Sequence, residues 1–173
     1  VCFHAQNLGA GRQDRIRRGT VKSLLIGLAM YGILGGLGML LTINGAYQHL
    51  FMSADKITEA TIRYGNIYLY VDLALYFMLM ILFVFRAAVQ GVGHAEYALV
   101  AGCAELVARV LICAFLPAMV NGGPIDSSAS TGAYIALCFG DPGAWTLAVA
   151  SLIYPAARYL FGAKSKKQRS LSA

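Results

Sequence analysis

Four ionisable residues stand inside long apolar stretches of this 173-residue sequence, where a charge needs a physical reason. They are Asp72, Glu105, Arg109 and Asp141. A charged side chain at the centre of a bilayer costs about 2.5–3.5 kcal/mol on insertion scales, so such residues usually pair with one another or bind an ion. The chemistry to expect from these four residues is therefore ion pairing, proton exchange or cation binding.

Glu105 and Arg109 are four positions apart, which places them on one face of a helix. Two adjacent opposite charges shed much of their burial cost together. The pair is therefore predicted to be self-neutralising and to lock helix packing. A functional role for one of its members is the alternative.

Asp72 has no oppositely charged residue within four positions, so it must face a cavity, another helix or the membrane interface. A carboxylate that has lost its water binds a proton or a cation more readily, and Asp72 is the tentative site for a coupling ion. Asp141 is followed by Pro142, which predicts a break in the helix. Asp141 is then either the N-cap of a half-helix or part of a break that lines protein or water, as in transporters. Glu105, Arg109 and Asp141 are together predicted to form an intramembrane polar network.

The elements that hold these residues are four apolar stretches, each near or above the ~20 residues needed to cross a bilayer as a helix. Hydrophobic residues make up 58% of the sequence and charged residues 13%, whereas a soluble domain carries about 25% charged residues. The fold class is therefore predicted as an all-α integral membrane protein with four transmembrane helices. The predicted spans are Val21–Ile43, Ile67–Val89, Ala95–Val120 and Ile135–Phe161.

The basic residues predict the orientation, because cytoplasmic flanks retain Lys and Arg. The head, the second loop and the tail hold most of the 14 basic residues, and the first and third loops hold only Lys56 and Arg63. Residues 1–20 are thus predicted as a cytoplasmic loop, residues 21–161 as the membrane part, and residues 162–173 as a disordered cytoplasmic tail. Anionic lipid headgroups explain the net charge of +6 better than nucleic acid does. The predicted location is the plasma (inner) membrane.

Several local signals refine this picture. The segment Val1–Ala10 is typical of the last turn of a preceding helix, which indicates a fragment of a larger polypeptide, and a polar turn is expected over Gln6–Arg15. Gly32 and Gly36 form a small-xxx-small pair that favours close approach of another helix. Ala54–Ile57 is typical of a helix start with Asp55 near the cap.

Several motifs resemble the multidrug and toxic compound extrusion (MATE) family of secondary transporters. The head is similar to the family's Gln-Asn-x-Gly-Ala-Gly…Arg loop, and the turn after the second span is similar to its Arg-x-x-x-Gln-Gly-x-Gly pattern. Weaker matches are Leu50-Phe51 with Asp55 and Ala60, Arg109, and Pro142 with Trp145. The residues that match the two loop motifs are Gln6, Asn7, Gly9, Ala10, Gly11, Arg15, Arg86, Gln90, Gly91 and Gly93.

This resemblance covers nearly the whole chain in order and spacing. It implies that the chain corresponds to the last four of twelve helices, within the second of two six-helix lobes. It also implies multidrug efflux by antiport: export of cationic or amphipathic drug-like compounds against inward flow of Na⁺ or H⁺, with no other cofactor. The partners it implies are membrane lipids, these small-molecule substrates and the remaining helices of the transporter. No family acid matches Asp72, whose role rests on its position alone.

Two alternatives stay open at this point. One is a flippase for a lipid-linked sugar from the same superfamily, and the other is a non-transporting helical scaffold subunit. An enzyme is not expected, because the spans contain no Ser/His, paired-Asp or His-x-x-x-His arrangement. The four cysteines show no Cys-x-x-Cys spacing, so neither a metal site nor a disulfide framework is predicted.

Overall fold

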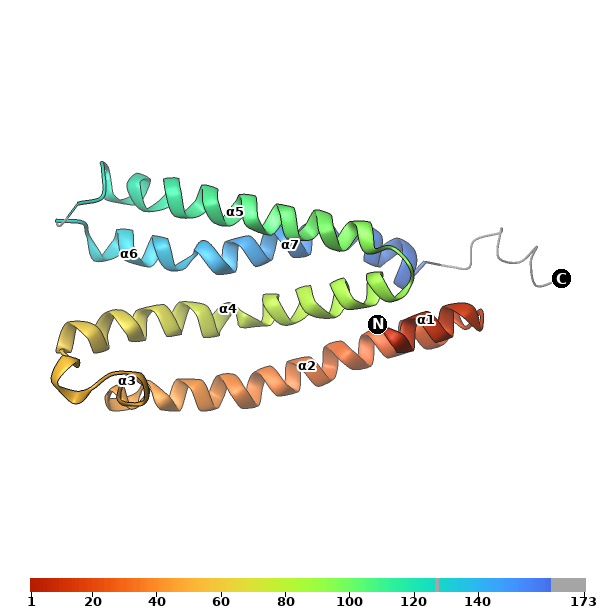
Figure 1. The fold of residues 1–173 in the computed structure, drawn as a ribbon, viewed down its shortest axis with the longest axis horizontal. Helices are drawn as coiled ribbons and strands as arrows, with labels where there is room; N and C mark the ends of the chain where they lie inside the picture. The colour runs from red at the N-terminus through yellow and green to blue at the C-terminus, as the bar shows by residue number, and fades with distance from the viewer. Residues whose placement is uncertain (127, 163–173) are drawn as a thin grey trace.

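The computed structural model describes residues 1–126 and 128–162, and this part of the chain is helical without a strand. Long helices run side by side along the bundle (Figure 1). The N-terminal helix and the last described residues, which we call the two chain ends, lie at the same end of it. The tail predicted for residues 162–173 lies almost entirely outside the described residues. The elements are α1 (Cys2–Gly9), α2 (Gln13–Leu41), η1 (Ile43–Gly45), α3 (Gln48–Phe51), η2 (Ala54–Lys56), α4 (Glu59–Gly91), α5 (Ala95–Asn121), α6 (Thr131–Cys138), α7 (Gly140–Pro155) and η3 (Ala156–Leu160).

Within the described residues, four helical segments are long and apolar enough to cross a membrane, as a multi-pass membrane protein requires. They are α2, α4, α5 and the broken segment Thr131–Leu160, which confirms the four predicted stretches. Three of them begin earlier than the apolar pattern indicates: α2 at Gln13, α4 at Glu59 and the broken segment at Thr131. Hydropathy marks the part of a helix that suits hydrocarbon, whereas the helix itself continues into polar turns. Acidic residues in the first turn, such as Asp14, favour the positive end of the helix dipole.

The start of α4 differs from the prediction. Ala54–Lys56 forms a short 3₁₀ turn, and the helix begins after Thr58. The Thr58 hydroxyl accepts a hydrogen bond from the Thr61 backbone N–H at 3.2 Å, which is the contact that caps a helix. Asp55 lies in the 3₁₀ turn, so its predicted role near a helix cap is wrong.

The head of the chain is more helical than predicted. Gln6 to Gly9 belong to α1, so the expected polar turn shrinks to Ala10–Arg12. Gly11 turns the chain there with φ +64°, a backbone region that side chains disfavour. The expectation of a helical turn at Val1–Ala10 is confirmed.

The last span is broken in its first third, just before Asp141-Pro142, which predicts a break. α6 ends at Cys138 and α7 begins at Gly140, with Phe139 alone between them. The N-cap of α7 is Phe139, and Asp141 is the second residue of the helix, so the N-cap interpretation of Asp141 is wrong. Any Cβ added to Gly140 would collide with the Cys113 sulfur, so the break also lets α7 approach α5 closely.

Small residues bring α4, α5 and α7 together. One cluster of buried side chains lies between these helices: Leu82, Ala101, Trp145, Ala148 and Leu152. By contrast, no residue in the most apolar 18-residue window of α2 is buried. Gly32 and Gly36 on that helix have nothing within 4 Å of an added Cβ, so the close helix contact predicted for them is not made within the described chain.

Candidate functional site: an intramembrane charge network

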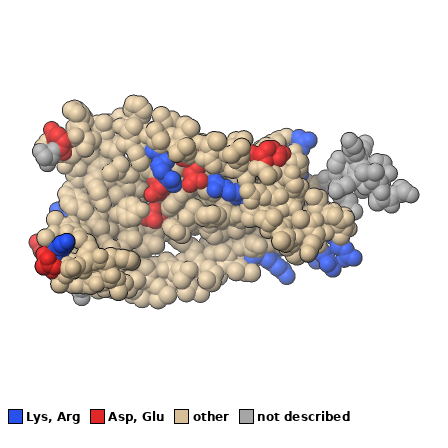
Figure 2. All heavy atoms as spheres, viewed as in Figure 1, with Lys and Arg blue, Asp and Glu red and all other residues tan. Residues whose placement is uncertain are grey.

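Four charged side chains from three helices form a continuous chain of ion pairs. Arg86 on α4 contacts Glu105 on α5 through Nη2 and Oε2 at 2.9 Å. The other Glu105 oxygen accepts from Arg109 Nη2 at 3.2 Å, and Arg109 Nε lies 2.8 Å from Asp141 Oδ1 on α7. Red and blue atoms gather accordingly in a band between the two ends of the bundle (Figure 2). We call Arg86, Glu105, Arg109 and Asp141 the charge network.

The predicted pair of Glu105 and Arg109 is confirmed, but it is only half of the network. Arg86 is 19 positions from Glu105 and lies on another helix, so sequence spacing gives no sign of this contact. Asp141 was predicted to belong to a polar network with Glu105 and Arg109, and its carboxylate lies close enough to Arg109 to pair with it. Two positive and two negative charges make the network neutral as a whole.

Arg109 is the most exposed member of the charge network, and it contacts acids on two helices. Its contact with Asp141 is short, yet its Nε finds no aligned hydrogen-bond acceptor in the described part of the chain. Its Nη2 meanwhile donates to Glu105. The guanidinium is therefore divided between two acids on different helices, and its side chain is 41% exposed. Such a group can shift toward either acid when the charge nearby changes.

Asp72 lies beside this network without joining it. Its Oδ1 atom is buried and has no hydrogen-bond partner within residues 1–126 and 128–162. Its carboxylate lies within electrostatic range of Asp141. Asp72 is thirteen residues beyond the start of α4 at Glu59, about 20 Å along the helix. When every group is ionised, Asp72 gives the whole site one excess negative charge.

A cavity of about 270 Å³ adjoins Arg109 and Asp141. Its walls come from α4, α5, α6 and α7, so a change in the spacing of these helices would alter it. Sequence reasoning missed most of its lining, although Tyr68 could have been found because it is four residues before Asp72 on the same face of α4. The lining residues are Tyr68, Arg109, Cys113, Tyr134, Leu137, Cys138, Gly140 and Asp141.

Arg86 is the one residue of the second loop motif that belongs to the charge network. The other residues of the two motifs lie away from this network, at the end of the bundle that holds the chain ends. Among the motif residues of the head, Gln6, Gly9, Ala10 and Arg15 are exposed, whereas Asn7 is buried. The Asn7 side chain donates to the Phe3 carbonyl at 2.7 Å within α1.

The glycines of the second motif have a structural reason. An added Cβ at Gly91 would lie 2.7 Å from the Cβ of His4, so this glycine lets α1 rest against α4. Gly93 turns the chain into α5 with φ +87°, which confirms the predicted helix stop, and Gln90 in the last turn of α4 is exposed. Gly91 and Gly93 therefore shape the contact and the turn at the end of α4, whereas Arg86 of the same motif takes part in the charge network.

His4 ties α1 to α2 at this end. Its Nε2 lies 3.0 Å from the Thr20 hydroxyl, which in turn donates to the Ile16 carbonyl. Burial lowers the pKa of His4 below its usual value of 6.5, because the charged ring loses its water. The imidazole is therefore held neutral in the folded protein.

Comparison with protein-family models, with curated proteins and with solved structures gives no match for this chain. Within the described residues, no three His, Cys, Asp or Glu side chains are grouped as a metal ion would need. The fold and the site together define a multi-pass helical membrane protein with a charge network and, in the part of the chain that the structure describes, an unpaired carboxylate between its helices.

Proposed function

We propose that this chain is the C-terminal part of a secondary active multidrug exporter that is driven by inward flow of Na⁺ or H⁺. The resemblance of its loop motifs to the MATE family supports this proposal. The observation that carries it is Asp72, a carboxylate with a buried, unpartnered oxygen beside an otherwise balanced charge network. A site whose charges were all paired would need no further ion, whereas this site carries one excess negative charge.

The chain's own residues supply a means of coupling. A proton or Na⁺ at Asp72 removes the repulsion between Asp72 on α4 and Asp141 on α7. Asp141 is then free to hold Arg109 more closely, which changes the balance between its contacts with Asp141 and Glu105. Since Arg109 belongs to α5, ion binding alters the forces among three helices. The break at Phe139 gives α6 and α7 a place to adjust separately.

The remaining helices of the transporter are proposed to complete the substrate path. The apolar exterior of α2 suits contact with such helices or with lipid hydrocarbon. The exported compounds are proposed to be cationic or amphipathic, because the site carries excess negative charge among aromatic side chains such as Tyr68.

The direct test is Asp72→Asn in the complete transporter, which keeps the size of the side chain and removes its charge. We expect resistance of cells to cationic dyes to fall at least fivefold with little change in surface expression. Asp72→Glu should keep part of the activity with a shifted pH dependence. Asp55→Asn is the matched control, because Asp55 is an exposed acid in a loop turn outside the network. Full export by Asp72→Asn at normal expression would favour a non-transporting role for these charges.

A further inference from the structure

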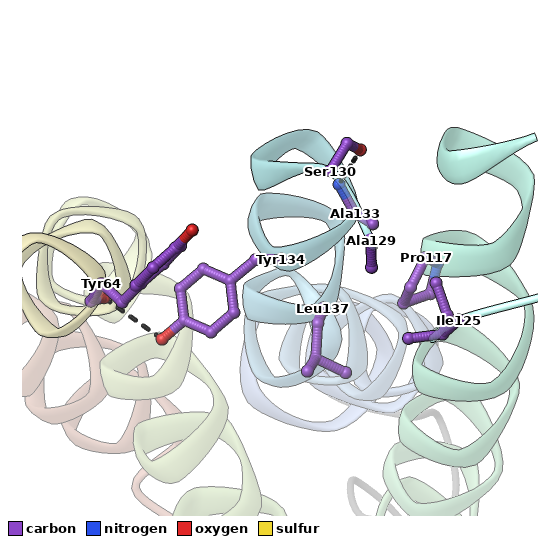
Figure 3. Close-up of a pocket in the computed structure, with 8 residues that line it drawn as sticks. All are labelled: Tyr64, Pro117, Ile125, Ala129, Ser130, Ala133, Tyr134 and Leu137. Atoms are coloured by element: carbon purple, nitrogen blue, oxygen red, sulfur yellow. Dashed lines mark hydrogen bonds between the residues drawn. The ribbon is translucent and has the colours of Figure 1, made fainter. Parts of the chain in front are cut away.

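An apolar cavity of about 440 Å³ lies at the end of the bundle opposite the chain ends, between α4, α5 and α6. Figure 3 shows Pro117, Ile125 and Leu137 on one side of it and the ring of Tyr134 near Tyr64 on the other. The Tyr134 hydroxyl donates to the Tyr64 carbonyl at 3.1 Å, and the two rings meet edge to face. The volume is within the range of ligand pockets, about 300–1,000 Å³.

A second, more polar groove of about 670 Å³ shares Tyr64 with this cavity. It is lined by the first turns of α4, including Glu59 and Arg63. These two residues are four positions apart on one helix face and both are exposed. No ion pair in the described part of the chain includes either of them, so both charges are free to meet a ligand.

The depth of these residues in the membrane fits a lipid headgroup. The hydrocarbon span is predicted to begin at Ile67, four residues after Arg63, or about 6 Å further along the helix. The headgroup layer on each side of a bilayer is about 5–7 Å thick. Glu59 and Arg63 thus lie at or just above the headgroups, and the apolar cavity reaches from Tyr64 toward the hydrocarbon.

We propose that the groove and the cavity together bind one phospholipid with a zwitterionic headgroup. Arg63 holds the phosphate, because a guanidinium matches phosphate oxygens in pairs. Glu59 holds the amine of the headgroup, and an acyl chain occupies the cavity beside Pro117 and Leu137. An anionic lipid would bring a second negative charge toward Glu59, and an organic cation would meet Arg63.

The site can be tested on the full chain, delipidated in detergent, by native mass spectrometry with added lipids. Phosphatidylethanolamine is expected to bind at least fivefold more tightly than phosphatidylglycerol. Free phosphoethanolamine should not compete, because it lacks the acyl chain. Equal or tighter binding of phosphatidylglycerol, or competition by the apolar cation tetraphenylphosphonium, would overturn the proposal.

Two variants with matched controls probe the two halves of the site separately. Arg63→Gln removes the phosphate contact, and Leu137→Trp fills the cavity. Each should weaken binding of phosphatidylethanolamine at least fivefold. Arg12→Gln and Leu147→Trp alter equally exposed residues elsewhere and should leave binding unchanged. If all four variants bind equally, the lipid is only part of the general annulus, and if Leu137→Trp fails to fold, Arg63→Gln decides.

Discussion

Glu105 holds two arginines at once, one from its own helix and one from α4. It is also the least exposed member of the charge network, at 18% of its side chain. Removing one partner of a fully buried pair costs about 3–5 kcal/mol, since it leaves a charge without compensation. The loss of Glu105 leaves Arg86 without an acid and Arg109 with Asp141 alone.

Double variants should show which pairs matter. Glu105→Gln is expected to lower the free energy of unfolding by about 2 kcal/mol. This loss is smaller than for a fully buried pair, because the two arginines are partly exposed. Adding Arg86→Gln should restore much of the loss, because the pair of Arg109 and Asp141 then remains balanced. Adding Arg109→Gln instead should not restore stability, because it leaves Arg86 and Asp141 each unpaired. Thermal unfolding in detergent measures the order of stability among these variants. Equal recovery of stability by both double variants would contradict the charge network.

Sequence reasoning reached only part of this site. The pair of Glu105 and Arg109 follows from helical spacing, which is a local property. The partners Arg86 and Asp141 come from helices that meet only in the folded bundle, so no spacing rule finds them. Asp72 was found because a lone acid in an apolar stretch is conspicuous, but its nearness to Asp141 depends on how α4 and α7 pack.

At the scale of elements, α1 rests against α4 through Gly91, where no side chain would fit. Gly91→Ala should therefore push α1 away and lower the unfolding temperature. Gly102→Ala on α5 is the matched control, because nothing lies within 4 Å of its added Cβ. There the gain of helix propensity, about 0.5–1 kcal/mol, should stabilise the protein slightly. Similar stability of the two variants would show that α1 is not docked on α4.

The contact between α1 and α2 should depend on pH through His4. The folded pKa of His4 is below its unfolded value of 6.5, so the folded state binds fewer protons than the unfolded state as pH falls below this value. Stability from the neutral ring is complete above about pH 6.5 and is lost as pH falls through the lower, folded pKa. His4→Gln should lose less stability than the parent protein between pH 7.5 and 5.5. An unchanged pH dependence in thermal unfolding would argue against a neutral, buried His4.

The apolar pattern predicted the four spans and the start of α5 at Ala95, but it placed the starts of the other three helical segments too late. Thr58 caps α4, whereas the nearby Asp55 resembles a cap in sequence and lies in a 3₁₀ turn. Both residues are good caps, and only the extended backbone at Thr58 decides between them. The break before Asp141-Pro142 was predictable because proline lacks the N–H that a helix interior needs.

For the whole molecule, the two long connections lie at the end of the bundle opposite the chain ends (Figure 1). The basic residues predict that this end faces outward. Single cysteines at Ser53 and Ser128, in a background without the four native cysteines, should react with a membrane-impermeant thiol reagent on intact cells. A cysteine at Ser170, in the tail beyond the described residues, should not react. Labelling of the cysteine at position 170 alone would show that the orientation is the reverse of the predicted one.

The central proposal is that cation flow through a site at Asp72 drives export. Its most direct measurement uses the complete transporter in proteoliposomes, with Na⁺ or H⁺ gradients imposed and transport of a cationic dye followed by fluorescence. We expect dye to move against its gradient only when the cation gradient runs in the opposite direction, and Asp72→Asn to abolish this dependence while Asp55→Asn preserves it. Dye transport that does not depend on either gradient, or that Asp72→Asn leaves unchanged, would contradict the account.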